Sequence, residues 1–161
     1  MIIAESNPCL FPQRHVLFTI YFGPAGNNSL PDISLLTKDE EFRMTENLTS
    51  ETFKEKVFDY QNEEKWKYKG TIPGIIDFYA DWCAPCKIVA PIIEELARNY
   101  EGRLNVWKVD TDVQAEIARE FKIQSIPSIL FIPLIGEPRM HTGALSKTAF
   151  QEIIKDELGL D

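Results

Sequence analysis

The sequence has few cysteines, fewer basic than acidic residues, and no long apolar run. Only three of its 161 residues are cysteine, and two of these are three positions apart. The chain therefore cannot carry a disulfide framework, and its cysteines point to redox or metal chemistry. Lysine and arginine number 17 against 25 acidic residues, a net charge of −8, which argues against the basic face of a nucleic-acid or anionic-membrane binder. No apolar run approaches the roughly 18 residues that span a bilayer, so neither nucleic acid nor a membrane is an expected partner.

What is present suits one globular domain with an appendage. The apolar fraction is 44% and the charged fraction 26%, both ordinary for a globular protein that buries a core. Residues 1–43 differ, because they hold four of the ten prolines and the polar run Gly26-Asn27-Asn28-Ser29. Their one apolar stretch, residues 16–22, is short and has no partner segment. We expect a poorly ordered extension over 1–43 and a folded domain over 44–161.

Two interpretations of the extension remain open. Arg14 precedes the apolar stretch and the small residues around Ala25 follow it, which imitates a secretory signal and would export the protein, for example to a periplasm. The basic region is thin, however, and Pro24 lies awkwardly at the cleavage point. Alternatively, translation begins at Met44 and the protein is cytoplasmic. The sequence favours this second interpretation slightly.

From Met44 onward, hydrophobic periodicity predicts alternating helices and strands. Helices are expected around four apolar sets: Phe53, Val57 and Tyr60 after the caps Thr49 and Ser50; Ile88, Val89, Ile92, Ile93, Leu96 and Ala97, with a kink at Pro91; Val113, Ile117 and Phe121; and Phe150, Ile153, Ile154 and Leu158 after the cap Ser146. Strands are expected at residues 74–80, 104–109, 129–132 and 139–143. Strands separated by helices are expected to pair in parallel, and the last two, joined by a turn, in antiparallel fashion. The fold class is therefore α/β, a mixed central sheet with helices on both faces.

The chemistry lies between the first of these strands and the next helix, in the motif Trp82-Cys83-Ala84-Pro85-Cys86-Lys87. Cys83 is placed at the helix N-terminus, where unpaired amides and the helix dipole stabilise a thiolate. Cys86 follows one helical turn later, within reach of Cys83, and its helical position predicts lower exposure and a resolving role. Pro85 suits a first helical turn.

Other interpretations of the two cysteines are weaker. A zinc site needs four ligands, and the remaining candidates, Cys9, His15 and His141, have no paired spacing. A purely structural disulfide would close too short a loop to add much stability. We therefore expect redox chemistry and no metal.

Asp77 is unusual because it lies in the middle of an apolar strand. Burial there would be costly and would raise its pKa. The alternative is that Asp77 lies on a wetter face of the sheet, together with Ile75 and Tyr79.

Residues 76–87 resemble the active-site segment of the thioredoxin family. The resemblance extends over residues 45–158 through four further segments in the same order: Ala90-Pro91-Ile92, Lys108-Val109-Asp110, Ser125-Ile126-Pro127-Ser128 and Gly143-Ala144-Leu145-Ser146-Lys147. It implies a thioredoxin fold and a protein-disulfide reductase that carries no bound cofactor. It also implies a monomer that reduces disulfide-containing proteins and receives electrons from a thioredoxin reductase.

The resemblance also implies a role for individual residues. Cys83 would attack the substrate disulfide, Cys86 would resolve the mixed disulfide, and Asp77, with Lys108 beside it, would help to deprotonate Cys86. A cis bond before Pro127 would place the backbone of Ile126 beside the sulfurs, where it could pair with a substrate strand. The substrate groove would be completed by Trp82, Ala84, Pro85, Gly143 and Ala144.

Two departures from the family pattern bear on function. Ala84 stands where glycine is usual, and the connection between Tyr60 and Ile72 is long, with Trp66 and Tyr68 expected to pack on the domain. Pro85 stands where oxidants and isomerases of the superfamily tend to have histidine, which favours a reducing role. The alternatives are an exported reductant or isomerase, and a redox-silent binding module. The aromatic residues Tyr100, Trp107 and Phe131 are expected in the core.

Overall fold

The computed structural model describes residues 45–161. The expectations for residues 1–43, for cleavage after Ala25 and for a start at Met44 lie outside the described residues. In chain order the elements are β1 (Glu46–Asn47), α1 (Ser50–Lys56), β2 (Gly74–Tyr79), α2 (Ala84–Asn99), β3 (Asn105–Asp110), α3 (Ala115–Glu120), β4 (Ser128–Ile132), β5 (Arg139–Thr142) and α4 (Lys147–Leu158). Sequence periodicity missed β1, because two residues are too few to show a period.

The strands form one mixed sheet in the order β1-β3-β2-β4-β5. β1, β3 and β2 are parallel, while β4 is antiparallel to both β2 and β5. The expectation that every strand after a helix pairs in parallel is therefore wrong for β4. The reason is the length of α3, which has six residues and spans about 9 Å, against about 20 Å for a six-residue strand. After α3 the chain therefore re-enters the sheet at the edge where β3 ended, and β4 runs in the opposite direction to β2 and β3.

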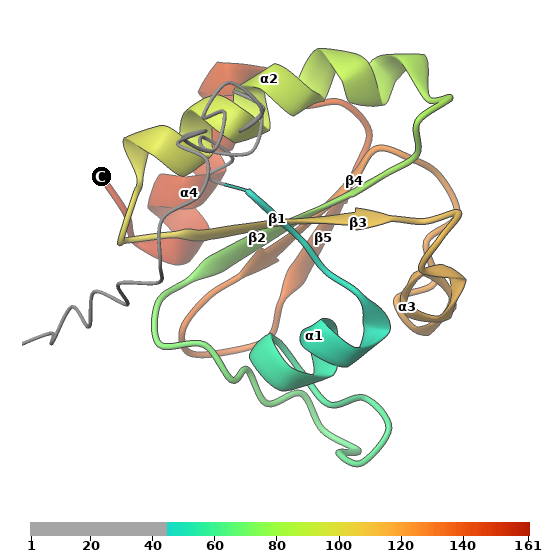
Figure 1. Ribbon diagram of the computed structural model, residues 1–161. Coiled ribbons are helices and arrows are strands. Elements are labelled where there is room, and N and C mark those ends of the chain that lie inside the picture. The colour runs from blue at the N-terminus through green and yellow to red at the C-terminus, as the bar shows by residue number, and fades with distance from the viewer. Residues whose placement is uncertain (1–44) are drawn as a thin grey trace, which may run out of the picture. The chain divides into compact units, whose positions relative to one another are not determined.

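Helices cover both faces of the sheet (Figure 1): α2 and α4 lie on one face, and α1 and α3 on the other. Side chains alternate along β2, so Ile75 packs under α2 and α4 while Ile76 faces the second core. The first core contains Tyr100, Phe131, Phe150 and Ile154 among others, and the second contains Phe53, Trp107, Ile117 and Leu130 among others. The expected core positions of Tyr100, Trp107 and Phe131 are confirmed.

Local hydrogen bonds set the helix ends. Thr49 caps α1 by accepting a bond from the amide of Thr52, and Ser146 caps α4 through the amide of Ala149. The expected helix around Phe53 ends at Lys56, so Tyr60 lies beyond it. The carboxylate of Asp59 accepts bonds from the amides of Gln61 and Asn62, and such side-chain bonds compete with helix continuation.

Two residues expected on buried helical faces are exposed. Ile88 is 68% exposed and Val113 is 71% exposed. The buried residues of α2 are Cys86, Val89, Ile93, Leu96 and Ala97, and Ile88 lies one position off this stripe. Val113 precedes α3, which begins at Ala115, so helical spacing does not apply to it.

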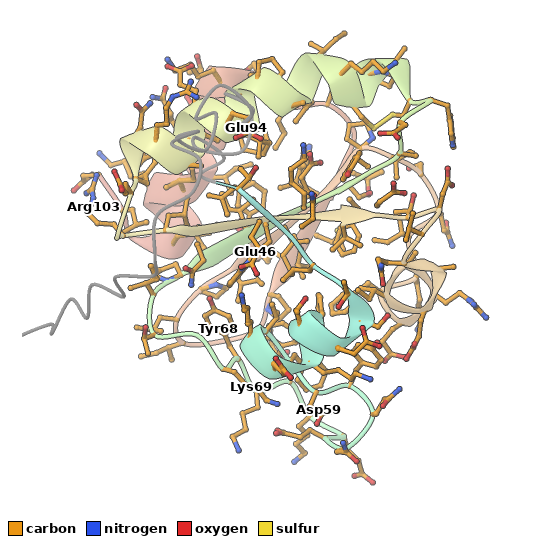
Figure 2. All side chains as sticks on the ribbon, in the orientation of Figure 1. Glu46, Asp59, Tyr68, Lys69, Glu94 and Arg103 are labelled. Carbon is orange, nitrogen blue, oxygen red and sulfur yellow. A yellow bond between two sulfur atoms is a disulfide. The ribbon has the colours of Figure 1, made fainter. Side chains whose placement is uncertain are left out.

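The long connection between α1 and β2 packs on the domain, as expected. The rings of Trp66 and Phe58 are 4.9 Å apart, and the hydroxyl of Tyr68 donates to the carbonyl of Ile72 at 2.8 Å. An ion pair at 4.0 Å joins Asp59, near the start of this connection, to Lys69, near its end (Figure 2). Over residues 45–161, no helix is both long enough and apolar enough to cross a membrane.

Candidate active site

The two cysteines lie where the buried strand β2 gives way to α2. Cys83 is the N-cap of α2, and its amide donates to the carbonyl of Ala80 at 3.1 Å. The sulfurs of Cys83 and Cys86 form a disulfide, with Cα atoms 5.3 Å apart. The amide of Cys86 also donates to Sγ of Cys83 at 3.2 Å. Pro85 lies in the first helical turn, where an amide proton would have no intrahelical partner.

The expectation that Cys86 is less exposed than Cys83 is wrong, because each residue is 3% exposed. Together with Ala80 they form a small buried cluster, against which Tyr79 and Ile126 pack. Their surroundings differ instead. Sγ of Cys83 accepts a hydrogen bond from the amide of Cys86 at the helix terminus. Cys86 instead lines a cavity that Asp77 also lines. This contrast, rather than exposure, distinguishes the two sulfurs.

Asp77 is buried in the sheet, so the alternative of a wetter face is wrong. It is 1% exposed, and neither carboxyl oxygen has a hydrogen-bond partner within residues 45–161. Burial raises the pKa of Asp77 to about 6, against the opposing charge of Lys108. Asp77 and Lys108 face each other across the pairing of β2 with β3. Together with Cys86 they line a cavity of about 140 Å³, which has room for water.

Lys108 lies close to two further side chains. Its Nζ is 3.9 Å from Oε1 of Glu94 and 4.8 Å from the centre of the Tyr79 ring. The same oxygen of Glu94 accepts a hydrogen bond from the hydroxyl of Thr45 at 2.7 Å. Sequence reasoning missed Glu94 and Thr45. Glu94 is one of two adjacent glutamates on a charged helix, and nothing in the pattern separates it from Glu95.

A second group of residues lies beside the disulfide, on the loops that flank β4 and β5. The Ile126–Pro127 bond is cis, as the family resemblance implies. The carbonyl of Pro127 accepts a bond from the amide of Gly143 at 2.8 Å. Gly143 has φ +104°, in the left-handed region that favours glycine. Ala144, next in the chain, is exposed.

The rim of the site is exposed on the cysteine side. Ala84 and Pro85 are exposed, and Trp82 is 71% exposed, with its Nε1 donating to Oδ2 of Asp112 at 2.7 Å. Sequence reasoning missed Asp112. The available signal was topological, since the parallel strands β2 and β3 end at the same edge of the sheet and bring their following loops together.

Metal ligation finds no support in the described part of the chain, where no group of three histidine, cysteine or acidic side chains could hold an ion. Cys9 and His15 lie outside that part, and His141 is on β5. The polar groups that converge on the disulfide are instead suited to moving a proton to or from a thiol.

Comparison with known proteins gives consistent matches. A family model described as Thioredoxin matches residues 44–156, a range that includes every site residue named above. The thioredoxin of Borreliella burgdorferi is 48% identical over 116 residues, which cover 72% of this chain and 99% of that protein. A bifunctional thioredoxin reductase/thioredoxin of Mycobacterium leprae is 41% identical over 85 residues, covering 52% of this chain and 18% of that protein. A crystal structure of chloroplastic thioredoxin z matches with a TM-score of 0.57 and 26% identity, covering 68% of this chain and 90% of that one.

Proposed function

The chain belongs to the thioredoxin family, and from this premise we propose that Cys83 and Cys86 carry its reduction of protein disulfides. It is a thiol–disulfide oxidoreductase of the protein-disulfide reductase type. One observation carries the assignment of residues. The Cys83–Cys86 disulfide spans the N-terminus of α2 and borders a cavity that also contains a buried carboxyl group.

Cys83 is the nucleophile in this proposal. As the N-cap of α2 its sulfur lies within reach of the amide of Cys86 and at the positive end of the helix dipole, and both favour a thiolate. In the dithiol form, the Cys83 thiolate attacks one sulfur of the substrate disulfide. A bond forms between Cys83 and that sulfur, the substrate disulfide breaks, and its other sulfur leaves as a thiolate that takes up a proton.

Cys86 resolves the mixed disulfide, and Asp77 receives its proton. The Cys86 thiol transfers a proton to the Asp77 carboxylate through the cavity that both residues line. The resulting thiolate attacks Sγ of Cys83, the Cys83–Cys86 bond forms and the bond from Cys83 to the substrate breaks. The second substrate sulfur leaves as a thiolate that takes up a proton, and Asp77 gives up the proton that it received. Two electrons and two protons thereby pass from the dithiol to the substrate. A pKa of about 6 for Asp77 suits this role, since a general base works best with a pKa near the working pH.

The substrate segment binds beside the disulfide. We assign the groove to Trp82, Ala84, Pro85, Ile126, Pro127, Gly143 and Ala144. The exposed Trp82 ring, fixed by Asp112, offers apolar contact. An extended substrate strand can add main-chain hydrogen bonds at Ile126.

Regeneration of the dithiol requires electrons, which a thioredoxin reductase supplies in this family. The name of the M. leprae relative joins the two activities in one protein. We propose that this chain works as a monomer in the cytoplasm, with no bound cofactor and no nucleic-acid or membrane partner. Pro85 before the second cysteine supports a reducing role there. Export is the alternative, and a mature N-terminus following Ala25, detected by mass spectrometry of the native protein, would establish it.

The two cysteines can be tested separately in insulin reduction coupled to NADPH and a thioredoxin reductase. Cys83→Ser is expected to reduce turnover to the uncatalysed background. Cys86→Ser is expected to retain attack but accumulate a substrate adduct on Cys83, visible as a mass increase that dithiothreitol reverses. Cys9→Ser is the matched control and should keep full activity. Undiminished insulin reduction by Cys83→Ser would overturn the proposal. Full biological activity of the Cys83→Ser/Cys86→Ser double variant would favour the redox-silent binding module instead.

A further inference from the structure

The ion pair between Lys108 and Glu94 lies beside the buried acid, and the proposed reaction does not use it. We propose that Glu94, anchored by Thr45, is a positioning residue that draws the Lys108 ammonium away from Asp77 and so leaves this acid able to accept and return the Cys86 proton. This inference rests on the proposed function, to which it adds a residue on α2 and one at the start of the domain.

The contacts of Lys108 support a position of its ammonium group near Glu94 and away from Asp77. Its backbone is opposite Asp77 in the pairing of β2 with β3, and both side chains line the same cavity. The ammonium nevertheless lies 3.9 Å from Oε1 of Glu94 and 4.8 Å from the centre of the Tyr79 ring. Neither oxygen of Asp77 accepts a hydrogen bond from any residue of the described domain. The lysine therefore acts on Asp77 through its charge and not through a hydrogen bond.

Glu94 is held in the position that this role requires. The hydroxyl of Thr45 donates to Oε1 of Glu94 at 2.7 Å, and Thr45 is only 7% exposed. Glu94 projects from α2 (Figure 2), and its side chain is 28% exposed against 19% for Lys108. Because both charges are partly withdrawn from water, their attraction is screened less than that of a surface pair. A single carboxyl oxygen thus joins the threonine to the lysine.

The other charged groups around Asp77 do not replace the effect of Lys108 on its ionisation. The titratable or charged side chains around its cavity are Tyr79 and Asp81 from β2 and its following turn, Cys86 and Lys87 from α2, and Lys108 from β3. β4 places the apolar Ile129 opposite Asp77. Asp81 and Lys87 are exposed, where solvent and salt screen their charges. Lys108 is therefore the cation whose position governs how readily Asp77 ionises. Burial raises the pKa of Asp77, and a closer ammonium would lower it.

Glu94→Gln tests the role directly, because it keeps the shape of the side chain and removes the charge that competes for Lys108. In the oxidised protein, the titration midpoint of Asp77, followed by carboxyl carbon-13 NMR, is expected to fall by at least about 0.5 pH unit. The acidic limb of the pH profile for the resolving step should move with it. Thr45→Val should shift the midpoint in the same direction by less. Glu95→Gln is the matched control: it removes a charge from the same helix, but Glu95 pairs with Lys147 at 2.6 Å, so the midpoint should not move.

A double-mutant cycle with Lys108→Met decides whether Glu94 acts through the lysine. In that background, the shift caused by Glu94→Gln is expected to fall below half of its value in the wild type. An undiminished shift would mean that Glu94 repels Asp77 directly, and the proposal would be wrong. It would also be wrong if Glu94→Gln left the midpoint in place, or if Glu95→Gln moved it equally. The NMR titration uses the oxidised protein without substrate, so its outcome is independent of whether Cys83→Ser abolishes insulin reduction.

Discussion

Asp77 occupies a position in β2 where an apolar residue would stabilise the fold. Its neighbours Ile76 and Phe78 are fully buried, and its own carboxyl has no hydrogen-bond partner in the described domain. Burial raises its pKa from 3.8 to about 6. Between these two values the native state holds a proton that the unfolded chain has lost, so the free energy of unfolding falls as pH rises. The stabilisation is complete below about pH 4 and is lost above about pH 6.

Asp77→Asn should remove this dependence, because asparagine is neutral throughout and has the same shape. Relative to the wild type, the free energy of unfolding of the variant should rise by roughly 3 kcal/mol between pH 4 and pH 8, since each unit of pKa is worth about 1.4 kcal/mol. Urea denaturation of the oxidised protein at both pH values measures the difference.

Asp59→Asn provides the contrast for this measurement. Asp59 is half-buried, and its hydrogen bond with the side chain of Asn62 lowers its pKa. Its stabilising contribution is present above about pH 4 and is lost only at lower pH, so Asp59→Asn should leave the difference in stability between pH 4 and pH 8 close to that of the wild type. If the difference between Asp77→Asn and the wild type were the same at both pH values, Asp77 could not have a raised pKa.

The sequence alone predicted part of this site. The placement of Cys83 and the anomaly of Asp77 follow from local pattern, because a strand, a cysteine pair and a helix are contiguous in the chain. Local pattern did not indicate Asp112 or Glu94, since each meets its partner only in the folded sheet. The order of the strands could have brought Asp112 near Trp82, whereas nothing in the sequence separates Glu94 from Glu95. Equal burial of the two cysteines also escaped prediction, because Ile126, from a loop distant in the sequence, packs against the cluster that they form with Ala80.

At the scale of elements, Gly74, the first residue of β2, allows the long connection before this strand to pack closely against β2 and β3. A Cβ atom at Gly74 would lie 2.6 Å from the Trp107 ring and 3.0 Å from the hydroxyl of Tyr68. Trp107 is 5% exposed and belongs to the core shared with α1 and α3, so it has little room to move. The glycine thus permits close packing of β2, β3 and the connection, with no unusual backbone angle involved.

Gly74→Ala is expected to lower the free energy of unfolding by about 1–3 kcal/mol, the usual cost of overpacking a core. Urea denaturation measures it. In a Trp107→Phe background the clashing ring atom is absent, so the alanine should cost less than half as much. Equal costs in the two backgrounds would show that the indole ring is not what excludes a side chain at this position.

Element boundaries were predicted best where pattern and capping agree. The helix after Ser146 and the strand from Gly74 fit the sequence closely. The direction of β4 could not be predicted from local pattern, because it depends on α3 being too short to run back along the length of a strand. The apolar Val113 suggested a longer α3, yet it precedes the helix and is exposed.

At the scale of the whole molecule, the described part of the chain contains every residue to which the fold and the proposed reaction have been assigned. Both hydrophobic cores, the disulfide, the buried acid and the residues of the proposed substrate groove lie within residues 45–161. The family model begins at residue 44. We propose that residues 44–161 form an independent domain and that residues 1–43 contribute nothing to its folding or chemistry.

A chain that begins at Met44 tests this division. It retains Thr45 and so the contact of that residue with Glu94. Its urea midpoint and its rate of insulin reduction are expected to match those of the full chain within error, because no residue of either core or of the proposed machinery is removed. Thr45→Val in the shortened chain should shift the Asp77 titration as it does in the full chain. A shortened chain that unfolded at clearly lower urea, or that reduced insulin several-fold more slowly, would assign residues 1–43 a part in the domain and move the boundary toward the N-terminus.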